Sequence, residues 1–411
     1  MIRSATNFDL ESIKSTDSIR GLNDLARGFS VLIPDGESHY AWSVLTCLRQ
    51  VPGLRSYVLS ASRSSVLKYS RLKDGLFYSN DDNTANWTEQ VLATAAKLKA
   101  DIILPVGDHG IRKLIGSGGP SISPAVMAPI PDRKSFDVAS DKWLLAKFMQ
   151  ENYIPTPETT IYESNAQLEN ITSSVRFPVL TKPVHGFGGK GIHLWNERSD
   201  LIGYLKDLRD PRSVIIQTFV RGFGIDCSVL CNHGKILAYT VQKESIRSSA
   251  EFRFPSGVRF VHNDEVHGVA GRLMSALNWS GVAHIDMIFD EADGRIKVLE
   301  INPRYWTSLL GSLSVGINFP YLQCLVGMGM ETSIPGYCEG QFITNGKRAI
   351  GATLKSVMRL SNPRNVVRNS ILKFQLKDPV LSAVMLYRSV SKKLVPETSD
   401  KLVTVQEPNA E

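Results

Sequence analysis

The feature that most restricts the fold of this chain is a glycine-rich segment that is followed by a strand pattern and not by a helix. Residues 181–195 read TKPVHGFGGKGIHLW, in which Gly186, Gly188 and Gly191 form a G-x-G-x-x-G pattern. Glycine lets a backbone turn tightly and approach a phosphate closely. Because GIHLW reads as a strand, the segment predicts a glycine loop inside a hairpin.

Three common phosphate-binding loops fit this segment poorly. A P-loop needs Ser or Thr after its lysine, but Gly191 follows Lys190 here. A dinucleotide-binding loop needs a helix directly after the glycines, because the helix N-terminus binds the pyrophosphate. A protein kinase needs H-R-D and D-F-G motifs, which this sequence lacks. A plain glycine-rich hairpin remains the alternative for the loop taken alone.

Composition places the chain among folded globular proteins. Its 411 residues, 43% hydrophobic and 21% charged, suffice for two or three domains with substantial cores. No apolar run approaches the roughly 20 residues that span a bilayer, and the N-terminus lacks a signal peptide's apolar core. The five cysteines form no C-x-x-C pair. These observations predict a cytoplasmic protein.

The chain divides into an α/β part and a later α+β part. Strand patterns FSVLIP, RSYVLSA and DIILPV alternate with helix patterns, which predicts a parallel sheet, and LPVGDHGI places polar residues at a strand end. Ser140 is expected to cap the next helix, and antiparallel strands should follow it. We therefore expect an N-terminal arm (1–27), a Rossmann-like domain (28–135), a second domain (136–335) with a lobe at about 155–235, and a C-terminal extension with a disordered tail (336–411).

Four polar residues could complete a phosphate site around the loop. Lys182 lies on the strand before the glycines, so its ammonium and the loop amides could face the same phosphates. Downstream, HIDMIFDEADGRIKVLEINPR predicts a hairpin in which Asp286 and Glu300 face one side, with Asn302 on the same face. Two carboxylates and an amide oxygen suit Mg²⁺ that bridges phosphates.

These segments, in this order, resemble those of ATP-grasp proteins. SDK at Lys142 and FPVLTKP at Lys182 match the family's phosphate-contacting lysines, HGFGGKG its lid, IIQTFVRG its adenine hinge, and DMIFD with LEINPR its metal-binding pair. The pattern EINPRYWTSL…GINFP is most similar to carboxylate–amine ligases of the carbamoyl-phosphate-synthetase-like branch. The resemblance implies a Rossmann-like domain followed by a two-lobed ATP-grasp fold.

The resemblance also implies roles for individual residues. Metal binding falls to Asp286, Glu300 and Asn302, and Arg304 is placed to grip the transferred phosphoryl group. Lys243, Arg247 and Arg253 are cationic candidates for binding a substrate carboxylate. The expected nucleotide-binding residues are Lys142, Lys182, His185, Gly186, Gly188, Gly189, Lys190, Gln217, Thr218, Phe219, Val220 and Asp226.

The sequence departs from the family pattern at three positions. Thr218 stands where many members have a hinge glutamate, and Gly224 stands where an acid often contacts ribose, so Asp226 could substitute. His284 stands where D-alanine ligases carry an arginine. These departures argue against the D-alanine subgroup and not against ATP binding.

The resemblance predicts an ATP-dependent ligase with Mg²⁺ or Mn²⁺. Such an enzyme phosphorylates a carboxylate, and an amine then displaces phosphate, so a small carboxylate and a small amine are the expected partners, in a homodimer as in many relatives. The alternatives are a bicarbonate-using carboxylase or carbamoyl-phosphate-type enzyme, and an inactive ATP-binding scaffold. An assay of ADP or phosphate release distinguishes these three functions.

The C-terminal part of the chain is strongly basic. Asp378 is the only acid between Lys347 and Lys393, against eleven Lys and Arg residues. A solvated cationic face is the favoured interpretation, and contact with an anionic lipid surface is the alternative. No nucleic-acid motif accompanies the charge, so a nucleic-acid partner is not expected.

Overall fold

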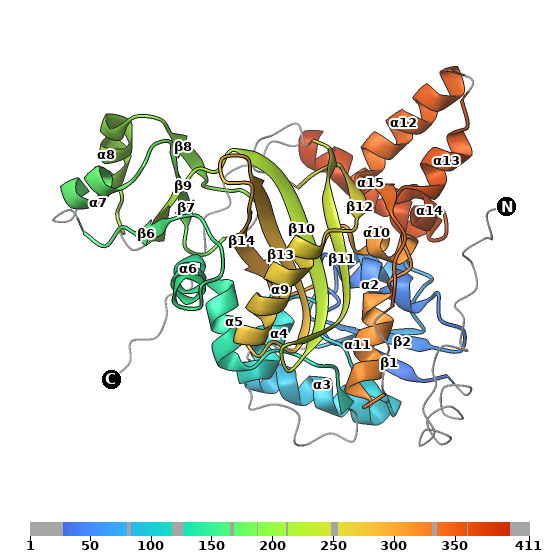
Figure 1. Cartoon of the computed structure of the whole chain (residues 1–411). Helices are drawn as coiled ribbons and strands as arrows, with labels where there is room; N and C mark the ends of the chain where they lie inside the picture. Colours follow the sequence, from blue (N-terminus) through green and yellow to red (C-terminus); the bar gives the residue numbers. More distant parts are fainter. Residues whose placement is uncertain are drawn as a thin grey trace.

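The computed structural model contains three β-sheets with helices packed around them (Figure 1). The predicted N-terminal arm, the disordered tail and Arg253 lie outside the described residues. None of the described helices combines the length and the apolar character that crossing a membrane requires. The structure describes residues 28–79, 84–116, 126–164, 168–186, 188–210, 213–247, 254–330, 335–359 and 361–394.

The first domain is the predicted parallel sheet, in the order β3-β2-β1-β4-β5. At the switch point between β1 and β4, the carboxylate of Asp35 accepts hydrogen bonds from the backbone N–H groups of Val106 and Gly107. Ligands bind at this edge in open sheets of this kind. The elements are β1 (Ser30–Ile33), α2 (Ala41–Leu48), β2 (Arg55–Ser60), β3 (Gly75–Tyr78), α3 (Thr84–Leu98), β4 (Ile102–Ile103), α4 (Asp108–Gly116) and β5 (Val126–Met127).

Two helices lead from the first domain to a small lobe. Asp141, and not Ser140 as expected, caps the second helix, because Ser140 ends the preceding helix while the Asp141 carboxylate accepts from the N–H groups of Trp143 and Leu144. The lobe is an antiparallel sheet in the order β6-β9-β7-β8. Its elements, with the two helices, are α5 (Arg133–Ser140), α6 (Lys142–Glu151), β6 (Thr159–Ile161), α7 (Leu168–Ser174), β7 (Val179–Pro183), β8 (His193–Trp195), α8 (Arg198–Lys206) and β9 (Val214–Thr218).

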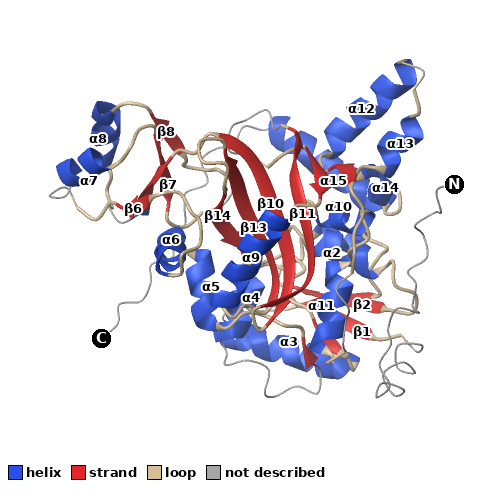
Figure 2. Cartoon of the chain, viewed as in Figure 1, coloured by secondary structure: helices blue, strands red, loops and turns tan. Residues whose placement is uncertain are grey.

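The central sheet is antiparallel, in the order β14-β13-β10-β11-β12-β15 (Figure 2). The central sheet includes the chain from Gly222 onward. The small lobe therefore ends near Thr218, and not near residue 235 as expected. The edge strand β15 of the central sheet comes from the chain beyond residue 336. Its strands and the helices beside it are β10 (Gly222–Asn232), β11 (Lys235–Ile246), β12 (Gly257–Val261), α9 (Asp264–Ala276), β13 (Gly281–Asp290), β14 (Ile296–Asn302), α10 (Leu309–Ser314), α11 (Phe319–Gly327) and β15 (Gly340–Ile343).

Strand alternation gives the central sheet two different faces. On β10, Val229 packs with α9 in one core, whereas its neighbour Leu230 packs in the core shared with the first domain and α10. Because side chains alternate with a period of two, Asp226 and Ser228 lie on the same face as Leu230. These polar residues of the site therefore lie on the face of the central sheet that packs against the first domain.

The basic C-terminal part folds into helices that pack against the first domain and the edge of the central sheet. It is anchored to the first domain through Asp378, whose buried carboxylate accepts hydrogen bonds from Ser70 Oγ (2.6 Å) and Trp42 Nε1 (3.2 Å). Arg71 Nε also donates to the Lys377 carbonyl at 2.6 Å. The helices are α12 (Gly346–Met358), α13 (Pro363–Arg368), α14 (Leu372–Gln375) and α15 (Pro379–Leu394).

We predict that Asp378→Ala lowers the free energy of unfolding by roughly 2–4 kcal/mol, since it leaves the buried Ser70 and Trp42 donors without their acceptor. Chemical denaturation of the variant measures this loss. The control is Ser382→Ala, which removes a less buried hydrogen bond from α15 to the Gln375 carbonyl at the end of α14. Equal small losses in both variants would contradict the anchoring role.

Candidate active site

A cavity of about 580 Å³ lies between the small lobe and the central sheet. Cavities of this size bind small organic ligands. Both predicted phosphate-binding lysines, the glycine loop and two of the predicted metal ligands line it. Its lining includes Lys142, Lys182, Gly186, Gly188, Gly189, Lys190, Phe219, Gly224, Asp226, Gln242, Glu244, Arg247, His284, Asp286, Glu300, Arg304 and Trp306.

The glycine loop joins β7 to β8, which pair in an antiparallel hairpin as predicted. Gly188, Gly189 and Gly191 all have φ near +70°, a conformation that residues with a side chain rarely adopt. A side chain at Gly191 would also lie 2.8 Å from Pro183 Cγ. The hairpin therefore depends on glycine both for its backbone shape and for its packing. Phe187 at the centre of the loop lies outside the described residues.

Lys142 connects the loop to the carboxylates. The Nζ of Lys142 donates to the Gly186 carbonyl at 3.0 Å and lies 3.3 Å from Glu300 Oε2. Asp141 caps the helix that begins with Lys142, so the cap fixes the direction in which this lysine leaves the backbone. One ammonium thus lies between the predicted lid and the predicted metal site.

Lys182 is buried one strand away. Its Nζ donates to Gln217 Oε1 at 2.7 Å, and Gln217 Nε2 donates in turn to Thr159 Oγ1 at 2.9 Å. Burial lowers the pKa of Lys182 to about 8, although the charge of Glu300 acts in the opposite direction. The side chain of Gln217 therefore positions the lysine, whereas the family resemblance had placed Gln217 only in the adenine hinge.

Asp286 and Glu300 face each other across β13 and β14, at paired positions of the hairpin. Burial and the neighbouring charge of Glu300 raise the pKa of Asp286 well above its ordinary value. Burial would raise the pKa of Glu300 as well, but Lys142 and the hydrogen bond from Asp286 outweigh it and lower that pKa. Without a cation, the negative charge of the pair is therefore favoured on Glu300 and disfavoured on Asp286.

The donor set fits a hard divalent cation. Asn302 joins the pair from β14, with its Nδ2 3.3 Å from Asp286 Oδ2. Carboxylate and amide oxygens are the ligands that Mg²⁺ prefers, and a cation beside Asp286 and Glu300 would offset the repulsion between their negative charges. Asp286 and Glu300 would hold such an ion, and Asn302 would join them only if its amide turned, because its Oδ1 accepts from Arg304 Nη2 at 2.7 Å.

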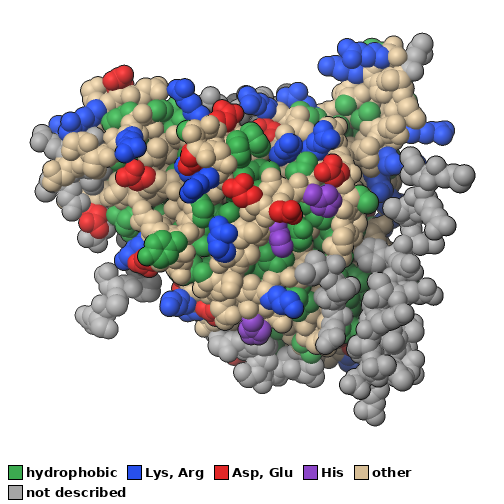
Figure 3. Space-filling view, in the orientation of Figure 1, with side chains coloured by type: hydrophobic (Ala, Val, Ile, Leu, Met, Phe, Trp, Pro, Cys, Tyr) green, Lys and Arg blue, Asp and Glu red, His purple; other side chains and the backbone are tan. Residues whose placement is uncertain are grey.

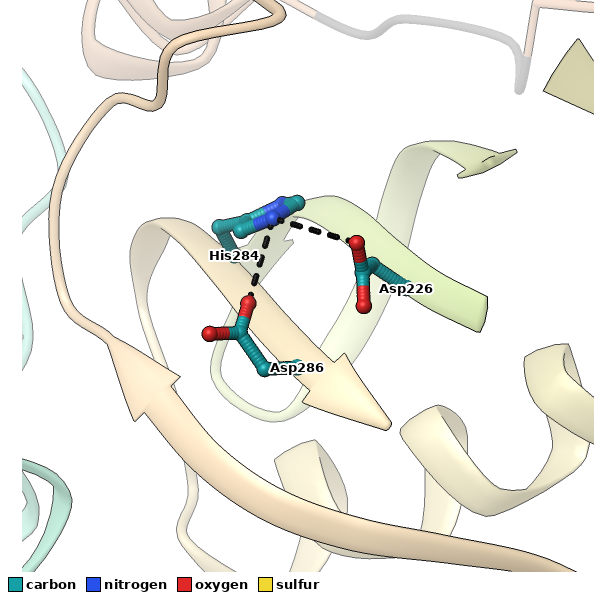
Figure 4. Close-up of side chains that lie close together, drawn as sticks. All are labelled: Asp226, His284 and Asp286. Atoms are coloured by element: carbon teal, nitrogen blue, oxygen red, sulfur yellow. Dashed lines mark ion pairs between the residues drawn. The ribbon is translucent and has the colours of Figure 1, made fainter. Parts of the chain in front are cut away.

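His284 adds a nitrogen to this cluster (Figure 4). Its Nε2 lies 3.2 Å from Asp286 Oδ1 and 3.9 Å from Asp226 Oδ2, and its Nδ1 lies 2.9 Å from Ser228 Oγ. Burial and the charge of Arg304 lower the pKa of His284 to about 3. The ring is therefore neutral, so other cations must balance the negative charge of the carboxylates. Sequence reasoning had noted His284 only as a departure from a subgroup pattern.

Arg304 ties the site to the first domain. Its Nε lies 3.1 Å from Asp108 Oδ2 on α4, its Nη2 donates to Asn302 Oδ1 at 2.7 Å, and its guanidinium carbon lies 4.8 Å from the ring centre of Tyr40. Asp108 comes from the LPVGDHGI segment, so the polar strand end contributes to this site. A guanidinium has five N–H donors, which leaves capacity for an anion in the cavity.

Several predicted residues lie elsewhere. Lys243 lies on the opposite face of β11, with its Nζ 5.8 Å from the ring centre of Phe223, because alternation turns Gln242 and Glu244 into the cavity. Arg247 lines the cavity and pairs loosely with Glu244 at 3.9 Å. Lys243 is thus removed from contact with a substrate in the cavity.

Some of the predicted hinge and lid residues line the cavity, and others do not. His185 is 76% exposed, with its Nε2 3.8 Å from Asp141, and it is not part of the cavity lining. Of the hinge residues, Phe219 lines the cavity, whereas Thr218 and Val220 do not. A backbone contact from this hinge to adenine stays a prediction.

Comparison with known proteins agrees with this geometry. The ATP-grasp domain family matches residues 139–308, which hold all the paired carboxylates and lysines described above. Residues 139–308 form an ATP-grasp domain. Sequence relatives of the chain include the carbamoyl phosphate synthase large chain of Methanosarcina barkeri, 26% identical over 220 residues, which are 51% of this chain and 20% of that protein.

Two further comparisons cover other members. The D-alanine–D-alanine ligase of Pseudomonas entomophila is 25% identical over 176 residues, 40% of this chain and 54% of that one. N5-carboxyaminoimidazole synthetase of Staphylococcus aureus, solved with ADP, has a TM-score of 0.60 at 13% identity and covers 77% of this chain and 82% of its own. This last likeness shows the fold alone, and it covers more of the chain than residues 139–308.

We predict that ATP binding weakens at alkaline pH. Lys182 must be charged to attract phosphate, and its pKa of about 8 means that the charged form is complete below pH 7 and is lost as pH rises. The Kd for ATP should rise by up to about tenfold per pH unit above pH 8 until binding itself opposes the proton loss. Titration of a fluorescent ATP analogue between pH 6.5 and 9.5 measures it.

The matched variant is Lys182→Arg, which keeps its charge at every pH in this range. Its absolute affinity is expected to fall, because a guanidinium does not fit a pocket built for an ammonium. Its pH profile should nevertheless be flat above pH 8. The same alkaline loss in this variant and in the native protein would assign the titration to another group.

Proposed function

We propose that the protein is an ATP-dependent ligase that joins a carboxylate to an amine through an acyl phosphate. The observation that carries the proposal is the convergence of Lys142, Lys182, the glycine loop and the Asp286–Glu300 pair on one cavity. Lysines and loop amides suit a triphosphate, and the carboxylate pair suits the cation that accompanies it. The relatives named above support the same chemistry.

A carboxylate needs activation before an amine can attack it, because its leaving group would be oxide. In the proposed first step, a substrate carboxylate oxygen attacks the γ-phosphorus of ATP, and the bond from that phosphorus to the β–γ bridging oxygen breaks to release ADP. In the second step, the amine nitrogen attacks the acyl carbon. The bond to the phosphate oxygen breaks, inorganic phosphate leaves, and the amine loses a proton.

The chain's own residues have separate tasks in these steps. Lys142 and Lys182 neutralise phosphate charge, and the glycine loop excludes water from the acyl phosphate when it covers the cavity. A divalent cation at Asp286 and Glu300 would supply further neutralisation of phosphate charge. Each of these groups is held by the protein before substrate arrives, which reduces the reorganisation needed in the transition state.

Release of ADP and phosphate tests the proposal. The purified protein is incubated with ATP, Mg²⁺ and pools of small carboxylic acids and amino acids, with bicarbonate in a separate arm. Hydroxylamine is added to trap an acyl phosphate as a hydroxamate. ADP release that needs an organic carboxylate supports the ligase. ADP release with bicarbonate alone would assign a carboxylase, and no release in any arm would leave only an ATP-binding scaffold.

We predict that Glu300→Gln lowers turnover by roughly a hundredfold or more, because it removes a negative charge from the cation site and the partner of Lys142. Thermal stabilisation by Mg²⁺ and ADP should fall with it, which gives a readout independent of any substrate. The control is Asp293→Asn in the exposed turn of the same hairpin. Wild-type turnover in Glu300→Gln would refute the metal assignment.

We predict that Arg304→Lys lowers kcat by roughly a hundredfold while the Kd for ATP changes only a few-fold, because lysine keeps the charge but loses the planar fork. Asp108→Asn should keep Arg304 in place with a weaker hydrogen bond and lower kcat less. Thermal melts check that both variants fold. Lost ATP affinity with preserved kcat would make Arg304 a ground-state binding residue.

A further inference from the structure

Helix α12 exposes its large apolar side chains and packs through its small ones. Ala349 and Ser356 are the buried residues of this helix, and they lie on the side that packs against α13 and α14. Helices of globular proteins normally show the reverse arrangement, with large apolar residues toward the core. The exposed apolar residues are Ile350 (41% exposed), Leu354 (59%), Val357 (54%) and Met358 (75%).

These four residues form one continuous stripe. Their spacing is i, i+4, i+7 and i+8, which at 3.6 residues per turn places them within an arc of roughly 100°. Lys347 lies within that arc and Lys355 lies beside it, while Arg348 and Arg359 lie farther round the helix, and all four are exposed. A stripe of this width, flanked by basic residues, is typical of helices that lie in the interface of a membrane.

The surface around the stripe carries little opposing charge. Asp378 is the only acid from residue 347 to residue 393, and its buried carboxylate is engaged by Ser70 and Trp42. The pair α12–α13 projects from the body of the protein, and blue Lys and Arg side chains gather on it (Figure 1; Figure 3). An apolar stripe therefore lies on a projection without exposed negative charge.

We propose that α12 docks the protein on the surface of an anionic lipid bilayer. Acyl chains would cover Ile350, Leu354, Val357 and Met358, and anionic headgroups would neutralise the basic residues beside them. A second copy of the chain fits this stripe less well, because two equally basic surfaces would repel each other. A nucleic acid would satisfy the charge but would leave the apolar stripe in water.

Co-sedimentation with vesicles tests the proposal. The full chain is mixed with vesicles of phosphatidylcholine alone and of phosphatidylcholine with phosphatidylglycerol. Binding is expected only to the anionic vesicles and should weaken as salt is raised from 50 to 500 mM, in keeping with screening over about 10 Å at 0.1 M. Equal binding to both vesicles, or binding to neither, would overturn the proposal.

Two variants separate the parts of the surface. Leu354→Glu with Val357→Glu, both at exposed positions, should weaken vesicle binding by about tenfold or more, because it removes apolar area and adds repulsion. Lys355→Gln with Arg359→Gln should also weaken binding and reduce its dependence on salt. The control is Tyr153→Glu, which replaces a side chain that is 92% exposed on another part of the protein.

The two other possible partners of the stripe, a second copy of the chain and a nucleic acid, give distinct results with the same variants. If a second copy of the chain covers the stripe, sedimentation equilibrium will show a dimer that only the Leu354→Glu, Val357→Glu variant dissociates. Such a dimer, together with no vesicle binding, would refute the proposal. Binding of a random RNA that the stripe variant leaves unchanged, again without vesicle binding, would refute it also. Unchanged thermal melts confirm that the variants remain folded.

Discussion

Two carboxyl groups buried side by side are the constraint on which the candidate site depends. Asp286 and Glu300 occupy paired positions of a hairpin in the central sheet, where they cannot both be charged without nearby cations. The protein places Lys142 Nζ 3.3 Å from Glu300 Oε2, and burial beside Glu300 disfavours the charged form of Asp286. A cation bound between the two carboxyl groups would relieve the same repulsion.

Arg304 extends this arrangement across the domain boundary. Its guanidinium contacts Asn302 of the central sheet and Asp108 of the first domain at once. A shift of the first domain relative to the central sheet would therefore change the position of a guanidinium that lines the cavity. The core shared by β1, α2, α10 and α11 makes such a shift costly, so the first domain serves as a fixed support for the site.

Much of this could be predicted from the sequence, because the two hairpins have recognisable strands and turns. The glycine loop follows from the two strands beside it, but the pairing of Asp286 with Glu300 also depends on a register shift between Asp286 and Met287, which the spacing around EADG does not reveal. Lys243 was misplaced because a charge at the end of a strand pattern does not reveal its face until the register with β10 is known. The contacts of Arg304 with Asp108, 196 residues away, have no local signal.

The C-terminal helices join the rest of the protein through both polar and apolar contacts. Their segment contributes β15 to the edge of the central sheet, and it rests on the first domain through the carboxylate of Asp378 and the contact of Arg71 with the Lys377 carbonyl. Phe374 and Leu381 add buried apolar area to the core that includes the first domain. With the segment held there, α12 buries its small residues Ala349 and Ser356, and its large apolar side chains are exposed.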